Sequence, residues 1–225
     1  MNPTTDKRLS NRFAALGVSL VMAMGTLACA TSTAPSTTVE LSDFEQVSDE
    51  AMAALKEPEN KIYRAEQGLA EAEEAVVAAD AEIATANKEL DAGKADKSAA
   101  EAEAKAAKVS EDKGRLSAAE GKITEAEDAI AKAKAHLAYA KADHSAAKKM
   151  VDLKTAEIAL AKAELELARV RLLDDQKVEA ADKYAVITFK EQVAEAEAEF
   201  AKVQAAYDSA AMEAKEKKGL WQKMG

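Results

Sequence analysis

The sequence is poor in the residues that make compact or cross-linked folds. Its 225 residues include one Cys, 3 Pro and 8 Gly, and aromatic residues make up only 4%. A single cysteine excludes an intrachain disulfide. Scarce Gly and Pro leave few points at which a helix must end. The hydrophobic fraction of 48% contains much alanine, and such a composition is typical of long helices or a coiled coil, with disorder as the alternative.

The sequence also lacks an excess of basic residues. It has 41 acidic against 31 basic residues, a formal net charge of −10. Nucleic-acid binding needs a surplus of Lys and Arg to neutralise phosphates, so we expect no nucleic-acid partner. The same acidity argues against broad electrostatic docking on anionic lipids.

The sequence contains no set of residues in a spacing typical of catalysis or metal binding. The two histidines, His136 and His144, are eight positions apart, so no helix places both around one metal without further ligands. There is no Gly-rich phosphate loop and no Ser/His/Asp arrangement. The many carboxylates are expected on solvated helix faces, where no pocket raises their pKa. We therefore expect no enzymatic activity, no metal, no cofactor and no small-molecule substrate.

Residues 1–28 have the pattern of a bacterial export signal. Three basic residues within the first twelve precede the apolar residues 13–28, a stretch too short for a comfortable transmembrane helix. The segment 26–29, TLAC, resembles the lipobox of bacterial lipoproteins, although its leucine stands one position later than usual. This resemblance implies cleavage before Cys29 and acylation of that residue.

The resemblance also implies a location and a membrane partner. Residue 30 is Ala and not the Asp associated with inner-membrane retention, which implies a lipid anchor in the outer membrane, on its periplasmic face. Several acyl chains anchor firmly, since each buried methylene contributes about 0.8 kcal/mol. The alternative is ordinary signal cleavage after Ala30, giving a periplasmic or secreted protein. Residues 29–40, rich in Ser and Thr, predict a flexible tether.

Large aliphatic residues recur every seventh position and predict two long helices. Alanine commonly stands three positions after each, which is an a/d heptad pattern and excludes disorder. The first series is Leu55, Ile62, Leu69, Val76, Ile83 and Leu90, and the second is Leu116, Ile123, Ile130, Leu137, Val151, Ile158, Leu165 and Leu172. His144 occupies one a position of the second series, where a polar residue more often sets register than binds a ligand.

The two series are out of phase by five residues around Gly114. A glycine there can take the left-handed conformation that ends a helix, and Ser117 to Glu120 has the spacing of a capping box. The pattern therefore predicts helices over 58–112 and 117–176, joined by a tight turn near Gly114. Folding the chain at that turn sets Leu90 opposite Leu137.

Pro58 divides the first helical segment. Because proline disfavours helix at the preceding residue, we expect a kink or a fresh start there. Residues 41–56 then form a short separate helix, with Ser42 as its N-cap and Glu45 three positions on.

The C-terminal segment 177–218 predicts a further helical arm with a bulky apolar stripe. Its candidate partner-binding residues are Val186, Phe189, Val193, Phe200 and Tyr207. Because an exposed stripe of this size is unusual in a monomer, either the chain folds back near Asp174 as a third helix, or the stripe binds a second copy or an envelope protein. The tail 219–225, with Trp221, is expected to be frayed, with an interfacial contact as the alternative.

Together these patterns predict an all-α fold, a long antiparallel helical hairpin or coiled coil over 41–218. The whole resembles bacterial outer-membrane lipoproteins with Ala-rich coiled-coil bodies, of which the murein-linked type is the familiar case. That resemblance implies a non-enzymatic periplasmic spacer, scaffold or partner-binding rod. An accessory component of an envelope transport or efflux system is the second hypothesis. Helical hairpins of efflux adaptors meet their partners tip to tip, but those adaptors also carry β-domains.

Overall fold

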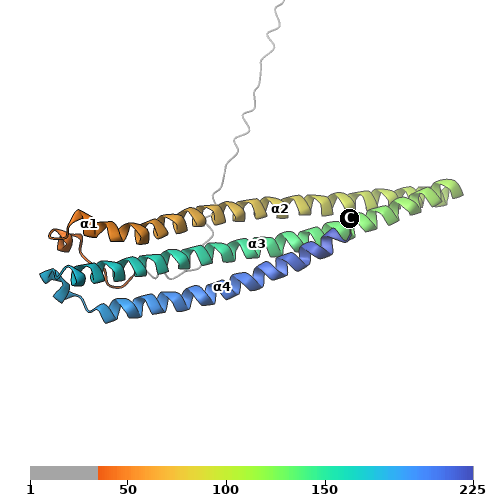
Figure 1. Ribbon diagram of the computed structural model, residues 1–225. Coiled ribbons are helices and arrows are strands. Elements are labelled where there is room, and N and C mark those ends of the chain that lie inside the picture. Colours follow the sequence, from red (N-terminus) through yellow and green to blue (C-terminus); the bar gives the residue numbers. More distant parts are fainter. Residues whose placement is uncertain (1–34, 225) are drawn as a thin grey trace, which may run out of the picture. The chain divides into compact units, whose positions relative to one another are not determined.

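The computed structural model describes residues 35–224, and within them it is all-α with no strand (Figure 1). Chain contacts separate residues 1–31 from 32–225, and everything described belongs to the second unit. The export signal and Cys29 lie outside the described residues. The elements are η1 (Leu41–Phe44), α1 (Asp49–Met52), η2 (Ala53–Leu55), α2 (Lys56–Val109), α3 (Lys113–Asp175), η3 (Glu179–Lys183) and α4 (Val186–Gln222). The all-α helical hairpin predicted from the heptads is confirmed.

A seam of small residues holds α2 against α3. The buried positions of the α2 seam recur every seven residues, and α3 repeats the pattern. The larger aliphatic residues three positions earlier are half-buried and flank the seam. The buried seam residues are Ala65, Ala72, Ala79, Ala86, Gly93, Ala100 and Ala107 in α2, and Ala119, Ala126, Ala133 and Ala140 in α3. Small side chains at these positions let the two backbones approach closely.

The turn between α2 and α3 is made by residues 110–112. Glu111 takes the left-handed conformation, with φ of 54°. Asp112 is the N-cap of α3, and its carboxylate accepts a hydrogen bond of 3.0 Å from the backbone N–H of Arg115. Asp is among the best N-cap residues because its side chain satisfies a free N–H of the first turn.

The turn therefore lies near Gly114, but the predicted roles of the residues were wrong. Gly114 sits in the first turn of α3 and does not end α2, and the capping box predicted at Ser117 lies inside the helix. The stop falls earlier because Glu111 takes the left-handed conformation and Asp112 caps the start of α3. The predicted helix over 117–176 becomes 113–175, and that over 58–112 becomes 56–109.

The predicted register between the two helices was wrong by about one helical turn. Setting Leu90 opposite Leu137 would bring Gly93 opposite Lys134. In the structure a Cβ built on Gly93 would lie 3.0 Å from Cγ1 of Ile130. Two sevenfold patterns match at several offsets, so the pattern alone does not determine which offset the turn selects.

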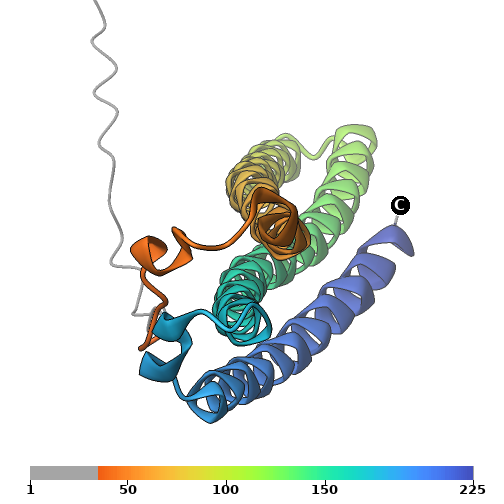
Figure 2. The same cartoon turned by 60° about the vertical axis from the view of Figure 1, so that its left-hand side comes forward.

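Large apolar side chains gather at the end of the body opposite the α2–α3 turn, which we call the base. There η1, η2 and η3 close over the ends of the long helices (Figure 2). The buried members of the base core are Val39, Phe44, Val47, Leu55, Leu165, Leu167, Val170, Leu172, Leu173, Val178 and Phe189.

Residues 41–56 do not form the single short helix that was predicted. They make η1, α1 and η2, and the N-cap of α1 is Ser48, whose hydroxyl accepts a hydrogen bond from the N–H of Ala51. Ser42 lies within η1 and caps nothing. A kink or a fresh start was expected at Pro58; in the structure α2 begins at Lys56, and Pro58 lies in its first turn, where its missing N–H removes no helical bond.

The chain folds back after α3 and forms a third long helix, which answers the question left open for the C-terminal segment. Residues 176–185 make the reversal, and α4 then packs along α3, so α3 lies against both α2 and α4 (Figure 2). The helix runs on to Gln222. The boundary of the predicted arm, 177–218, and the separate tail, 219–225, are corrected accordingly.

The helix α4 is shorter than α3 and leaves part of the hairpin uncovered. It has 37 residues against 63 in α3, and its last turn reaches α3 at His136, on which Trp221 stacks. Beyond this contact the α2–α3 pair continues alone to its turn (Figure 1). We call this two-helix part, residues 94–129, the tip.

Candidate functional site

The first described residues dock on the base. The backbone N–H of Val39 donates a hydrogen bond of 2.8 Å to Oε2 of Glu166, and the side chain of Val39 is only 4% exposed. The other oxygen of Glu166 accepts a bond of 2.6 Å from Arg169. Glu166 is itself buried, so the carboxylate is satisfied by these two donors and fixes the incoming chain to α3.

Two further contacts extend the docked segment. The N–H of Glu40 donates to the hydroxyl of Tyr184 at 3.1 Å, and the side-chain amide of Gln192 donates to the hydroxyl of Ser36 at 3.1 Å. The flexible tether predicted over 29–40 was therefore wrong for its last residues. The Ser- and Thr-rich composition of this segment does not show that residues much later in the chain, near and within α3 and α4, bind it.

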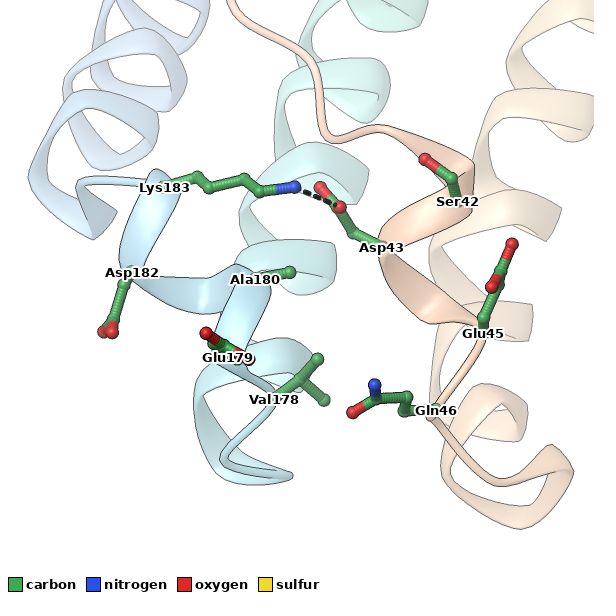
Figure 3. A pocket seen from close by; sticks show the side chains of 9 residues that line it. All are labelled: Ser42, Asp43, Glu45, Gln46, Val178, Glu179, Ala180, Asp182 and Lys183. Carbon is green, nitrogen blue, oxygen red and sulfur yellow. Dashed lines mark hydrogen bonds and ion pairs between the residues drawn. The ribbon is translucent and has the colours of Figure 1, made fainter.

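A buried carboxylate joins η1 to η3 beside this segment. Asp43 accepts a bond of 2.7 Å from the ammonium of Lys183 (Figure 3). It also accepts one of 2.6 Å from the hydroxyl of Tyr184. The hydrogen bond from Lys183, then that from Tyr184, holds the pKa of Asp43 below its usual value, although desolvation opposes the shift. The same pair raises the pKa of Lys183.

An open hollow of about 460 Å³ adjoins this pair. Its walls come from η1 and from the reversal between α3 and α4 (Figure 3). The lining residues are Ser42, Asp43, Glu45, Gln46, Val178, Glu179, Ala180, Asp182 and Lys183. Apart from Asp43, its acidic side chains are exposed to solvent.

Among residues 35–224, His136 is the buried polar residue that lies away from the base. It is 3% exposed, and its ring nitrogens lie 2.7 Å from Oε2 of Glu89 and 2.6 Å from Oε1 of Glu82, both on α2. Burial alone lowers the pKa of an imidazole. Here the hydrogen bonds and charges of the two glutamates outweigh the burial and raise the pKa of His136.

Aromatic rings from α3 and α4 close over this histidine. The indole of Trp221 stacks on the imidazole, with centroids 4.1 Å apart and planes at 4°. Tyr139 continues the stack 5.4 Å from Trp221, and the ammonium of Lys218 lies 5.6 Å from the Tyr139 ring centroid. The frayed end expected at Trp221 was therefore wrong, because the indole has a docking partner that a local pattern does not show.

The second histidine makes a simpler contact. Nε2 of His144 lies 3.2 Å from Oδ1 of Asp80 across the α2–α3 interface. Between residues 35 and 224, no three His, Cys, Asp or Glu side chains converge in a way that could hold a metal ion. Both histidines thus serve the packing of α3 against α2 in this structure.

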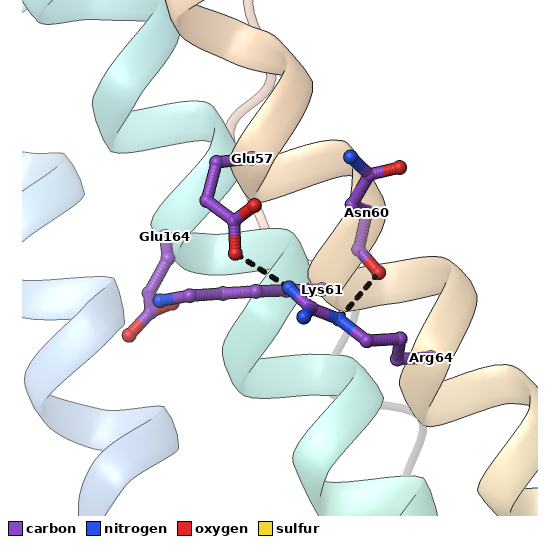
Figure 4. Close-up of polar contacts among 5 residues, drawn as sticks. All are labelled: Glu57, Asn60, Lys61, Arg64 and Glu164. Atoms are coloured by element: carbon purple, nitrogen blue, oxygen red, sulfur yellow. Dashed lines mark hydrogen bonds and ion pairs between the residues drawn. The ribbon is translucent and has the colours of Figure 1, made fainter.

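Ion pairs cross the hairpin along its length. Near the base the ammonium of Lys61 lies 2.8 Å from Oε2 of Glu164, while Arg64 bonds to Glu57 and to the carbonyl of Asn60 within α2 (Figure 4). Exposed pairs of this kind contribute about 0–1 kcal/mol each. They favour one register of α2 on α3 more than they stabilise the fold.

Further pairs of the same kind lie in the tip. Lys97 contacts Glu127 at 2.6 Å, and Lys122 contacts Glu103 at 2.7 Å.

The five candidate partner-binding residues all lie on α4. Phe189 is 1% exposed in the base core, and Val186 and Val193 pack against the same core. Phe200 and Tyr207 are half-buried. The bulky stripe thus meets α3 of the same chain at its first three positions, while the candidate acylation site, Cys29, lies outside the described residues.

No protein-family model matches the chain, and neither a curated protein nor a solved structure shows significant similarity to it. Over the part of the chain that the structure describes, no helix is both long and apolar enough to cross a membrane.

The residues that reasoning from sequence missed act in pairs from distant elements. Val39 meets Glu166, and Trp221 meets His136. The sequence offers one sign of the His136 cluster: Glu82 and Glu89 are seven residues apart and therefore lie on one face of α2. The arrangement can dock chain segments and hold a proton between carboxylates.

Proposed function

We propose that this protein is a non-enzymatic lipoprotein of the bacterial cell envelope, anchored in the outer membrane through Cys29 and acting as a helical spacer or scaffold in the periplasm. The observation that carries the proposal is the asymmetry of the body. The chain enters at the base, where the large apolar core and the docked segment lie, and the tip projects beyond the end of α4.

The docked segment gives the anchor a short reach. Residues 30–34 are all that separate Cys29 from Pro35, where the described chain begins. Fully extended, they span at most about 20 Å. An acylated Cys29 would therefore hold the docked segment close to the membrane surface and leave little free tether.

The helices are long enough for a spacer. At 1.5 Å per residue, the 54 residues of α2 extend about 80 Å and the 63 residues of α3 about 95 Å. A hairpin of this length presents its turn far from the point where the chain enters. This separation of an anchored end from a free end supports a scaffold more than a catalyst.

Mass spectrometry of the mature N-terminus tests the anchor. We expect a triacylated N-terminal Cys29 and recovery in the outer-membrane fraction, with Cys29→Ser released from that fraction. A mature chain that begins at Thr31 and fractionates as a soluble protein would contradict the anchor. The helical body would then act as a periplasmic or secreted protein.

The bare tip favours a second function, accessory to an envelope transport system. The exposed Val109, at 87% exposure, ends α2 at the turn, and a projecting two-helix turn is the part that such hairpins present to partners. A photo-crosslinker at Val109, matched by one at exposed Val77 on the side of α2, tests it in cells. Products with pump components from Val109 alone would support transport, and their absence would leave the spacer.

A further inference from the structure

The end of α4 is attached to the hairpin in an unusual way. Next to its last turn, the packing of α4 on α3 consists of alanines, with Ala142 and Ala146 of α3 against Ala214 of α4. Alanine buries little apolar area, so these contacts hold the helix weakly. Beyond these alanines, the indole of Trp221 stacks on His136 of α3.

The hydrogen bonds that His136 can make depend on its protonation. Neutral imidazole has a single N–H donor, whereas protonated imidazole has two. Both ring nitrogens of His136 face a carboxylate, Glu82 on one side and Glu89 on the other. Only the protonated ring satisfies both, and only that form gives the stacked indole a cation to attract.

We propose that His136, Glu82, Glu89 and Trp221 form a pH-sensitive latch, which holds the C-terminal end of α4 on the hairpin while His136 is protonated and releases it when the proton leaves. Release requires only the last turns of α4 to separate, because Phe189 keeps the other end of the helix in the base core.

The direction of the pH dependence follows from the groups around the ring. From α2 the two glutamates favour the charged imidazole. From α4 the ammonium of Lys218 lies 5.6 Å from the ring centroid of Tyr139. The glutamates raise the pKa of His136, so the latch is complete below the ordinary histidine value of about 6.5 and is lost as pH rises through the raised value.

The latch contains its own probe, because Trp221 is the only tryptophan of the chain. Protonated imidazole stacked on indole quenches its fluorescence. In the full-length mature protein we expect the emission of Trp221 to rise with pH between about 5 and 9, with a midpoint above about 6.5. Hydrogen exchange of residues 214–222 should accelerate several-fold over the same range.

Variants separate the latch from a general effect of pH. We expect His136→Gln to abolish the transition and His144→Gln, the matched control whose ring nitrogen pairs with Asp80, to keep it. The double variant Glu82→Gln, Glu89→Gln retains the imidazole and should move the midpoint to lower pH. A midpoint unchanged in this double variant, or a transition that persists in His136→Gln, would overturn the proposal. The test does not depend on the lipid anchor, so a negative result would not contradict the proposed function.

Discussion

The base and the tip of the same hairpin are held together in different ways. At the base, side chains such as Leu173, which is fully buried, fill a core shared by α3, α4 and the short helices. In the tip, the fully buried contacts between α2 and α3 are made by alanines, flanked by half-buried aliphatic side chains and by ion pairs such as Lys97–Glu127. The base thus buries more apolar area per residue, and the tip instead gains close backbone approach.

This difference assigns most of the folding stability to the base and leaves deformation and binding to the tip. Burial of a large side chain contributes about 1.5–3 kcal/mol, whereas alanine contributes a fraction of this. The base can therefore hold the entering chain firmly, while the tip remains the part most easily deformed or bound. The substitutions below test this division, beginning with the largest expected effect.

Truncating an aromatic side chain should show most clearly that the large core is confined to the base. We expect Phe189→Ala, in the base core, to lower the free energy of unfolding by about 3–5 kcal/mol through the cavity it leaves. The matched Phe200→Ala, half-buried on the same helix, should cost less than half as much. Urea denaturation followed by circular dichroism measures both, and equal losses would show that the core is not confined to the base.

Enlarging a seam residue should break the close approach of α2 and α3. Ala86 has no exposed surface, so Ala86→Leu forces the backbones apart and should cost about 1–3 kcal/mol. Ala84 is exposed on the same helix, and Ala84→Leu should be almost neutral. Thermal unfolding of the two variants checks this, and an equally mild effect of both would mean that the seam is not tightly packed.

Two glycines also test how closely α2 and α3 pack. A Cβ added at Gly121 meets nothing within 4 Å, so Gly121→Ala should stabilise the protein by about 1 kcal/mol through helix propensity. At Gly93 the added carbon approaches Ile130 at 3.0 Å, so Gly93→Ala should gain less. Equal gains in melting temperature would contradict the contact between Gly93 and Ile130.

The smallest effect concerns acid stability at the base. The pKa of Asp43 is lowered by the hydrogen bond from Lys183, so the stabilisation is present above the unfolded value of about 3.9 and is lost as pH falls through the folded value. We expect Asp43→Asn to lower the melting temperature slightly at neutral pH and to flatten its fall on acidification. Parallel curves for the variant and the wild type would show that this carboxylate is not coupled to folding.

The sequence predicted the helices better than their contacts. The heptads of large aliphatics and alanines indicated α2 and α3, because a regular stripe can only be buried along another helix. The same regularity concealed the register, since shifting α3 by a turn still matches apolar residues with apolar residues. The turn was placed near the right residue through Gly114, although Glu111 and Asp112 form it.

The polar clusters could not be predicted for a different reason. Trp221 and His136 are far apart in the chain, and the residues next to each of them in the sequence do not indicate that the two meet. Their meeting depends on the length of α4 and on the place where the chain reverses after α3. Docking of Val39 on Glu166 likewise requires the base to be assembled first, so local composition indicated a tether.

Hydrogen exchange along the full-length mature protein tests the contrast between base and tip most directly. Backbone amides exchange at rates set by the free energy of the opening that exposes them. We predict that residues 165–173, in the base, exchange most slowly, and that residues 100–116, around the turn, exchange at least about tenfold faster. Equal protection of the two segments would contradict the account, because it would mean that the tip is as firmly held as the base.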